Sequence, residues 1–261
     1  MPSSRSESPT FPSSDPGPGL AHPAAALAVK VVLAPLLVAQ AVATRRRAPV
    51  LPEAEGDREG VFGNDGPVFR LLVAGDSSAA GVGVARQEQA VVGHLVRTLH
   101  RATGRPVAWA LRARTGLTTR GVHALLAAAP PFAAEVAVVI TGVNDVIDQV
   151  TTRRAVRDRA ALADWLLGSA GVRHVAFAPL PPVHRFPLLP EPLRRVLGSD
   201  ARRHDVALAR WAATRADVSH ARIALELDAA GMASDGFHPG EPVYRACGEA
   251  LALHVAGLEL R

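Results

Sequence analysis

Cysteine and lysine are almost absent from this sequence, and each absence excludes a class of functional site. Among its 261 residues Cys247 is the only cysteine, which excludes an intrachain disulfide and a zinc site built on several cysteines. Lys30 is the only lysine, so the chain after it lacks the lysine of a Walker-type phosphate loop. The same absence excludes a pyridoxal or other Schiff-base lysine there, and we expect no cofactor.

Aromatic residues are also scarce, at 4% of the chain. Leucine, valine and alanine must therefore form the core, and 48% hydrophobic with 20% charged residues excludes a wholly disordered chain. The formal net charge of +5 comes from scattered arginines, with few aromatic side chains to stack on bases and no nucleic-acid-binding motif. We therefore expect no nucleic-acid partner.

The first 67 residues differ in composition from the rest and divide into three segments. Residues 1–23, rich in Ser, Pro and Gly, predict a disordered tail. Residues 24–47 join an apolar stretch at 24–44 to three arginines, which favours membrane association with the following domain on the cytoplasmic side. A soluble cytoplasmic chain with this helix packed on its domain, or an exported chain, are the alternatives. Residues 48–67, with repeated Pro and Gly, predict a linker before a domain at 68–261.

From residue 69 onward, predicted strands alternate with predicted helices. The hydrophobic pattern predicts strands at 69–74, 106–112, 135–141, 172–178 and 222–227, and helices at 87–101, 118–128, 151–168, 193–215 and 242–256. This alternation is typical of parallel strands joined by right-handed crossovers, which indicates a three-layer α/β/α sandwich. In such folds the functional site lies at the carboxyl ends of the strands.

Four short motifs fall at those strand ends: residues 75–78 (GDSS), 114–116 (RTG), 142–145 (GVND) and 235–239 (DGFHP). Each one alone has an ordinary structural explanation. A serine or asparagine there can cap a helix, a glycine can end a strand, and an Asp three residues before a His can form a local turn. Their common order and placement favour a shared active site.

Together the four motifs resemble the four sequence blocks of the SGNH (GDSL-type) hydrolase superfamily, over about residues 68–261. The first block departs from the family's name, since GDSS stands for GDSL, and the second differs from the commoner form. The resemblance implies a parallel, flavodoxin-like sheet. It also implies roles for individual residues: Ser77 as nucleophile, His238 as base, Asp235 as its partner, and Gly116 and Asn144 as oxyanion donors.

The chemistry of these residue types agrees with such roles. A serine hydroxyl needs a base to remove its proton during attack, and imidazole titrates near neutrality. We therefore expect a serine esterase that cleaves small carboxylic esters with short to medium acyl chains, since few aromatics are available for a large lipid groove. The loop at 180–193 follows a strand end, and its Phe186 is a candidate wall of the acyl pocket. No G-x-S-x-G is present, which argues against an α/β-hydrolase fold.

Two alternatives remain at this point. A metal-dependent phosphoesterase would use Asp76, Asn144, Asp235 and His238, although adjacent Asp-x-His and Asn-His pairs are missing. A nucleotide-binding module would use the glycines at 81 and 83, but the third glycine of the dinucleotide motif is replaced by Arg86.

Overall fold

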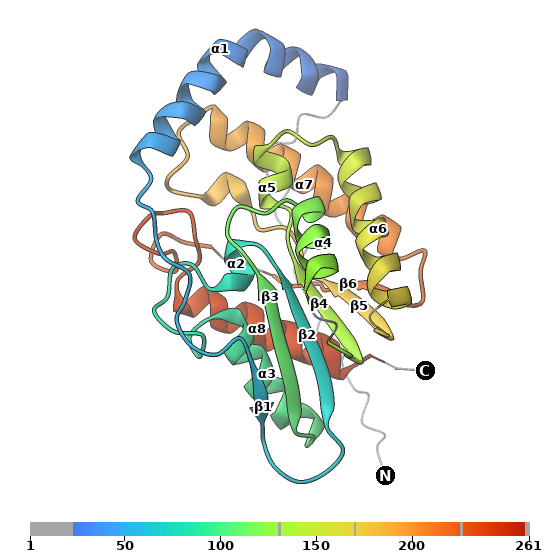
Figure 1. The fold of residues 1–261 in the computed structure, drawn as a ribbon. Coiled ribbons are helices and arrows are strands. Elements are labelled where there is room, and N and C mark those ends of the chain that lie inside the picture. Colours follow the sequence, from blue (N-terminus) through green and yellow to red (C-terminus); the bar gives the residue numbers. More distant parts are fainter. Residues whose placement is uncertain (1–22, 130–131, 170, 225–226, 259–261) are drawn as a thin grey trace, which may run out of the picture.

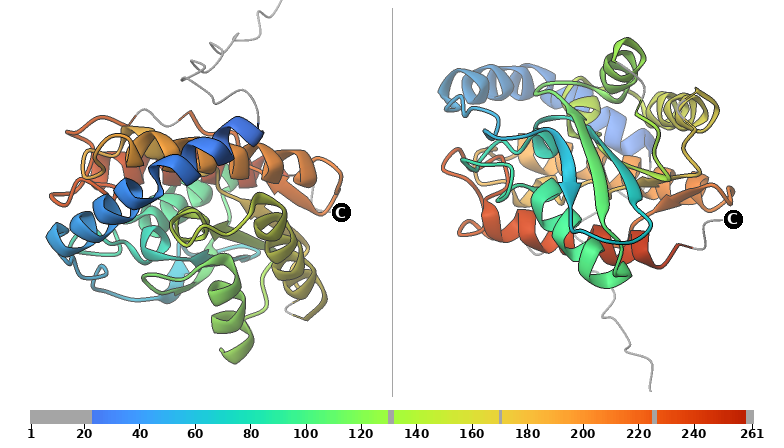
Figure 2. Two further views of the ribbon diagram at one scale, coloured as in Figure 1. Left: turned by 90° about the horizontal axis from the view of Figure 1, so that it is seen from above. Right: turned by 60° about the horizontal axis from the view of Figure 1, so that its bottom comes forward.

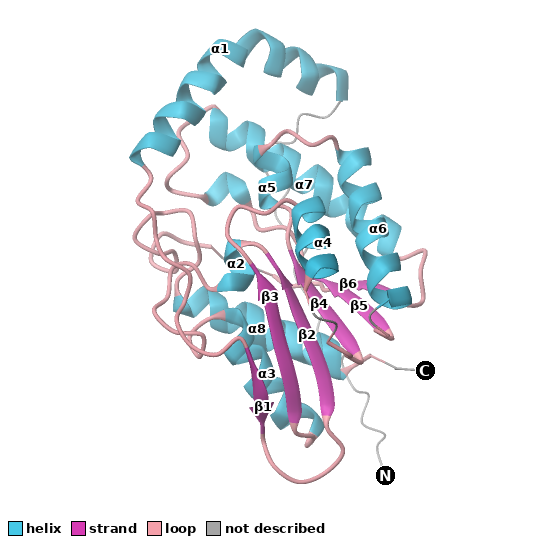
Figure 3. Ribbon diagram, in the orientation of Figure 1, coloured by secondary structure: helices cyan, strands magenta, loops and turns pink. Residues whose placement is uncertain are grey.

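A computed structural model describes residues 23–129, 132–169, 171–224 and 227–258 (Figure 1). Within them, six strands form one sheet in the order β1-β3-β2-β4-β5-β6 (Figure 3). The strands are β1 (Glu59–Phe62), β2 (Phe69–Gly75), β3 (Val107–Ala113), β4 (Val136–Ile140), β5 (His174–Phe177) and β6 (Val218–His220). β1 is antiparallel to β3, and every other pairing is parallel. The five parallel strands have the flavodoxin-like order, as the resemblance predicts.

Helices cover both faces of this sheet (Figure 2). The helical elements are α1 (Pro23–Arg47), α2 (Ser77–Ala80), α3 (Val91–Thr103), α4 (Thr119–Ala128), α5 (Val143–Ile147), α6 (Thr152–Ser169), the 3-10 turn η1 (Val183–Arg185), α7 (Leu193–Ala212) and α8 (Glu241–Ala256). α3 and α8 pack on one face, and α4, α6 and α7 pack on the other. The predicted three-layer α/β/α sandwich is therefore confirmed.

Strand β2 shows how the sequence divides the core between the two faces. Leu71 and Val73 are buried with the side chains of α3 and α8, whereas Leu72 and Ala74 are buried with those of α4 and α6. Successive strand residues point to opposite faces, so a strand covered on both sides is apolar at every position. This explains the continuous apolar run that ends directly before the GDSS motif.

The last parallel strand lies earlier in the chain than predicted. β6 spans Val218–His220 rather than 222–227, of which residues 225 and 226 lie outside the described part. Its sequence, VSH, carries no apolar run. Its central residue, Ser219, instead bonds two histidine rings, His174 Nε2 at 2.9 Å and His254 Nε2 at 2.8 Å. The apolar residues that suggested a strand, Ile223 and Leu227, instead line the main cavity.

The segment predicted as a linker, 48–67, contains the edge strand β1. All four β1 side chains are exposed, so this strand has no hydrophobic alternation that a sequence pattern reveals. Ahead of it, Ala54 N–H donates to Ala80 O at 3.2 Å and Glu55 N–H to Ala85 O at 2.9 Å. The segment is thus part of the folded domain. The predicted tail, residues 1–23, lies almost wholly outside the described part of the chain.

The apolar stretch 24–44 lies within α1, which runs beyond the carboxyl end of the sheet and contacts α7 (Figure 1). In the described ranges no helix is long and apolar enough to cross a membrane.

Candidate active site

Ser77 stands at the first turn after β2, where α2 begins. Asp76 caps this short helix, and its carboxylate accepts the Ser78 N–H at 3.0 Å. The cap is therefore Asp76 and not Ser77, so the serine hydroxyl is available for other contacts. Burial raises the pKa of Asp76 to about 7.

His238 and Asp235 lie in the loop that leads into α8, and the structure brings them to Ser77. His238 Nε2 is 3.1 Å from Ser77 Oγ, and His238 Nδ1 is 2.6 Å from Asp235 Oδ2. Since Nδ1 donates to the carboxylate, the neutral ring accepts the serine proton at Nε2. These are the contacts that a serine nucleophile and its general base need.

The Asp235 carboxylate is itself fixed by the backbone of its own turn. Its Oδ1 accepts the N–H of Phe237 and the N–H of His238, each at 2.9 Å. Burial alone would raise the pKa of Asp235, but these bonds and the His238 ring outweigh it and hold the pKa below its usual value. A buried, ionised carboxylate beside Nδ1 stabilises the imidazolium that forms when the ring takes a proton.

Asn144 is inside α5 and is not its cap, which is Gly142. Its amide Nδ2 donates to the Leu117 carbonyl at 3.0 Å, and the residue lines the same cavity as Ser77. An amide nitrogen carries two hydrogens, so one fixes the side chain and the second is left for a ligand.

Gly116 is in the loop after β3, with φ +82, a left-handed conformation that glycine adopts at little cost. It is exposed and is not among the residues that line the cavity.

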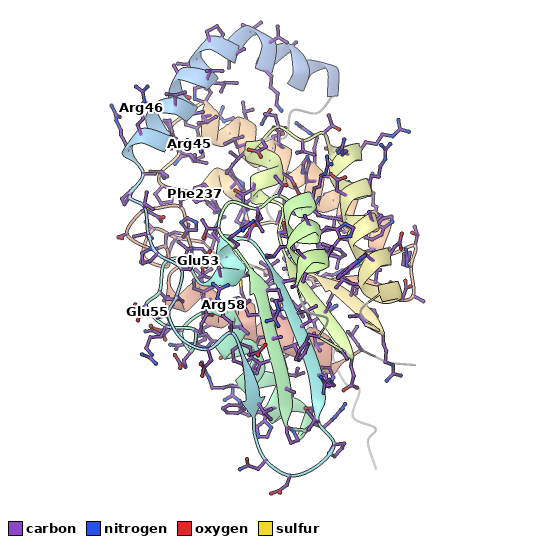
Figure 4. The ribbon with its side chains drawn as sticks, in the orientation of Figure 1. Arg45, Arg46, Glu53, Glu55, Arg58 and Phe237 are labelled. Carbon is purple, nitrogen blue, oxygen red and sulfur yellow. The ribbon has the colours of Figure 1, made fainter. Side chains whose placement is uncertain are left out.

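The adjacent Thr115 is held by Glu53, whose Oε1 accepts the Thr115 N–H at 2.7 Å and its hydroxyl at 2.8 Å. Glu53 also pairs with Arg58 beside α2 (Figure 4). Sequence analysis missed Glu53, because nothing marks one acid within a segment rich in Pro and Gly.

A narrow cavity of about 80 Å³ opens beside Ser77 and is bounded mainly by apolar side chains. The predicted wall residue Phe186 lies in it, buried and packed edge-on against Phe237 with ring centroids 5.1 Å apart. Phe237 in turn packs edge-on against the His238 ring. Other apolar lining residues are Val91, Ile140, Val143, Ala178, Pro179, Pro181, Ile223, Leu227, Met232, Val243 and Leu251.

A buried ion pair beneath the site was also missed from the sequence. Asp145 accepts the Thr119 N–H at 3.0 Å and the Thr119 hydroxyl at 2.5 Å, which joins the first turn of α4 to α5. Arg159, fully buried on α6, lies 3.4 Å from the same carboxylate. The Thr119 bonds join the start of α4, which follows the loop of Gly116, to α5, which carries Asn144, and Arg159 ties the same carboxylate to α6.

The two alternatives receive little support from the geometry. In the described part of the chain, no three His, Cys, Asp or Glu side chains gather as metal ligands would. A Cβ at Gly83 would lie 2.4 Å from the Pro239 carbonyl, so this glycine packs against the loop of His238. It therefore does not open a phosphate cradle.

Comparison with known proteins identifies the family of this chain. The model of the GDSL-like lipase/acylhydrolase family matches residues 73–246, whereas no curated protein matches the chain. Among solved structures, the lipase Lip_vut3 from a goat rumen metagenome is 18% identical, with a TM-score of 0.58 over 74% of this chain and 100% of its own. The inhibitor-bound aryl esterase of M. smegmatis is 21% identical, with a TM-score of 0.55 over 73% and 99%. The lipase/acylhydrolase of Enterococcus faecalis is 17% identical, with a TM-score of 0.51 over 74% and 98%.

These structures share the fold of this chain. The family match spans more than half of the chain and includes the positions of Ser77, Asn144 and His238. The chain therefore belongs to the GDSL-like lipase/acylhydrolase family, in the SGNH hydrolase superfamily, and it is a carboxylic ester hydrolase.

Proposed function

We propose that this hydrolase cleaves small carboxylic esters by a serine mechanism, with Ser77 as nucleophile, His238 as general base and Asp235 as its partner. The observation that carries the proposal is the unbroken series of contacts, 3.1 Å from Ser77 to His238 and 2.6 Å from His238 to Asp235. Both distances lie within reach of proton transfer.

In the proposed reaction, Ser77 Oγ attacks the ester carbonyl while His238 Nε2 takes its proton. The resulting oxyanion accepts hydrogen bonds from the Asn144 amide and from the backbone N–H groups of Ser77 and Gly116. His238 then protonates the departing alkoxide as the C–O bond breaks, which leaves an acyl group on Ser77. Water, deprotonated by His238, attacks this acyl-enzyme, and His238 returns the proton to Ser77 Oγ as the bond between Oγ and the acyl group breaks, which releases the carboxylic acid.

The cavity beside Ser77 supports a short to medium acyl chain as the favoured substrate. Its walls are mainly apolar, which suits an alkyl chain, and Phe186 and Phe237 are among the side chains that bound it.

A series of p-nitrophenyl esters of increasing acyl length tests this proposal. We expect Ser77→Ala to lower kcat by about a thousandfold or more, because it removes the nucleophile. Ser78→Ala is the matched control, since Ser78 lines the same cavity and bonds no catalytic group through its side chain. Full activity in Ser77→Ala, or an equal loss in both variants, would contradict the assignment.

The same series tests the acyl pocket. Phe186→Leu shortens a wall of the cavity while keeping it apolar, so the preferred chain should become longer and turnover of the acetate ester should change little. A uniform change across all chain lengths would instead show that Phe186 serves only to support Phe237 and His238.

A further inference from the structure

Helix α1 exposes an apolar face along the side that points away from the domain. Val31, Val38 and Val42 have exposed fractions of 66%, 62% and 45%. Residues seven and eleven positions apart lie on one side of a helix, so these three valines form a single stripe.

The opposite face of α1 is the one that carries the polar contacts. Lys30 Nζ lies 2.5 Å from Asp200 Oδ2 on α7 and 2.9 Å from Gln149 Oε1. Gln40 donates to the Glu191 carbonyl at 2.6 Å and accepts the Leu193 N–H at 3.2 Å. A helix on a water-exposed surface normally places its polar residues outward. On α1 the exposed side is apolar, whereas Lys30 and Gln40 lie with Leu37 on the side that contacts the domain. The exposed side therefore suits contact with an apolar medium.

The charges around this face are positive. Arg45, Arg46 and Arg47 end the helix, are exposed, and form no ion pair with any described residue. At the same end of the sheet, a groove between α4 and α6 is lined by four arginines and two aspartates: Arg120, Arg153, Arg154, Arg157, Asp145 and Asp158. Only Arg154 of this group pairs with a carboxylate in the described part of the chain. Guanidinium groups next to an apolar stripe suit lipid phosphates beside acyl chains.

The position of α1 relates this face to the active site. α1 lies beyond the carboxyl ends of the parallel strands, the end at which Ser77 and Asn144 stand (Figure 1). A flat surface against α1 would therefore face the end of the molecule that holds the cavity.

We propose that the outer face of α1 binds the surface of an anionic lipid bilayer, with Val31, Val38 and Val42 in the apolar layer and Arg45–Arg47 on the headgroup phosphates. The helix lies along the membrane and holds the catalytic end of the sheet toward the lipid. The functional value of this orientation rests on the proposed ester hydrolysis, whereas the lipid binding does not require that hydrolysis.

Sedimentation of the full chain with lipid vesicles tests the proposal. One set of vesicles contains phosphatidylcholine alone, and the other contains roughly a third phosphatidylglycerol. We expect strong binding to the second set only, weakened by salt. Replacing all three arginines, Arg45→Gln, Arg46→Gln and Arg47→Gln, should weaken it by about a hundredfold, because each arginine near an anionic surface contributes about fivefold.

Val38→Asp should weaken binding at least tenfold, because a charge replaces an inserted valine. The matched control is Leu253→Asp on α8, a helical position with the same exposed fraction, 62%, but remote from α1. Hydrolysis of a soluble ester, unchanged in the arginine variant, Val38→Asp and Leu253→Asp, verifies folding. If Val38→Asp does not hydrolyse the soluble ester, the arginine variant still tests the proposal. Ser77→Ala separates the two proposals, since it should lose hydrolysis and bind vesicles as the wild type does.

Three results would overturn the proposal. One is equal binding by Val38→Asp, Leu253→Asp and the wild type. Another is vesicle binding whose strength depends neither on phosphatidylglycerol nor on the three arginines. The third is a dimer that Val38→Asp dissociates, without any vesicle binding, which would identify a second copy of this chain as the partner of α1.

Discussion

At the scale of single residues, the proposed reacting groups are oriented by partners that the backbone fixes. His238 is held by Asp235, whose other oxygen accepts two backbone N–H groups of the same turn. Asn144 is held by the Leu117 carbonyl. Because each partner is nearly immobile, the side chains need little reorganisation when charge develops on the substrate.

Asn144→Ala should separate oxyanion stabilisation from the structural bond to Leu117. If the second amide hydrogen reaches the oxyanion, the variant loses about 2.7–4 kcal/mol of transition-state stabilisation. Its kcat then falls by roughly a hundredfold to a thousandfold, with KM little changed. Loss of the Leu117 bond alone costs about 1 kcal/mol of unfolding free energy. Asn144→Asp should be at least as damaging, because a carboxylate repels the oxyanion. Steady-state kinetics and chemical denaturation measure both effects, and an Asn144→Asp enzyme with wild-type turnover would disprove the role.

The raised pKa of Asp76 predicts a specific pH dependence of the free energy of unfolding. Burial raises its folded-state pKa from 3.8 to about 7, so the folded state binds the proton more tightly than the unfolded state does. Its contribution to stability is therefore full below the unfolded pKa and is lost as the pH rises through about 7. Asp76→Asn still accepts the Ser78 N–H but does not titrate. The unfolding free energy of the variant relative to wild type should rise by up to about 4 kcal/mol between acidic and mildly alkaline pH. Parallel pH profiles from urea denaturation would contradict this.

Sequence analysis identified some residues of the candidate site and missed others, for a physical reason. Ser77 and Asn144 stand in short motifs directly after strands, and Asp235 and His238 stand in a short motif before α8. The resemblance of these motifs to the family's sequence blocks identified all four residues as candidates. Glu53 and Arg159 act through partners that are distant in the chain, Thr115 and Asp145, so only the folded structure reveals them.

At the scale of elements, the segment from Glu53 to Phe62 acts as part of the site. β1 extends the sheet by pairing with β3, and Glu53 holds the loop that follows β3. The sequence showed no such role, since β1 lacks an apolar face and its neighbours are Pro and Gly. A buried strand can be predicted from its run of hydrophobic residues. Edge strands such as β1 and β6 depend instead on hydrogen bonds that the sequence does not display.

Glu53→Ala should therefore lower kcat by roughly tenfold, because the loop bearing Gly116 loses its anchor and the proposed oxyanion donor is displaced. KM should change less. Glu53→Gln keeps an oxygen that accepts the Thr115 N–H and should restore most of the turnover. Glu55→Ala is the control, because Glu55 contacts the domain through its backbone and its side chain is exposed. Equal kinetics for Glu53→Ala and Glu55→Ala would remove Glu53 from the positioning of the site.

At the scale of the whole molecule, the parallel sheet gathers four distant segments at one end. The carboxyl ends of β2, β3 and β4 carry Ser77, Gly116 and Asn144, and the loop before α8 brings His238 from the far end of the chain. This arrangement follows from the strand order, in which β2 lies between β3 and β4. The cavity and α1 lie at the same end, so catalysis and the proposed lipid binding share one face.

Covalent labelling by an organophosphonate ester tests the central claim most directly, because such a reagent forms a stable bond with an activated serine. Trypsin cleaves after Arg70 and Arg86, so Ser77 and Ser78 fall in one peptide, and fragmentation of that peptide by mass spectrometry locates the adduct. We predict stoichiometric labelling of Ser77, loss of hydrolysis in step with labelling, and no adduct in Ser77→Ala. An adduct on Ser78 or elsewhere, or full hydrolysis by a protein already labelled at Ser77, would contradict the account.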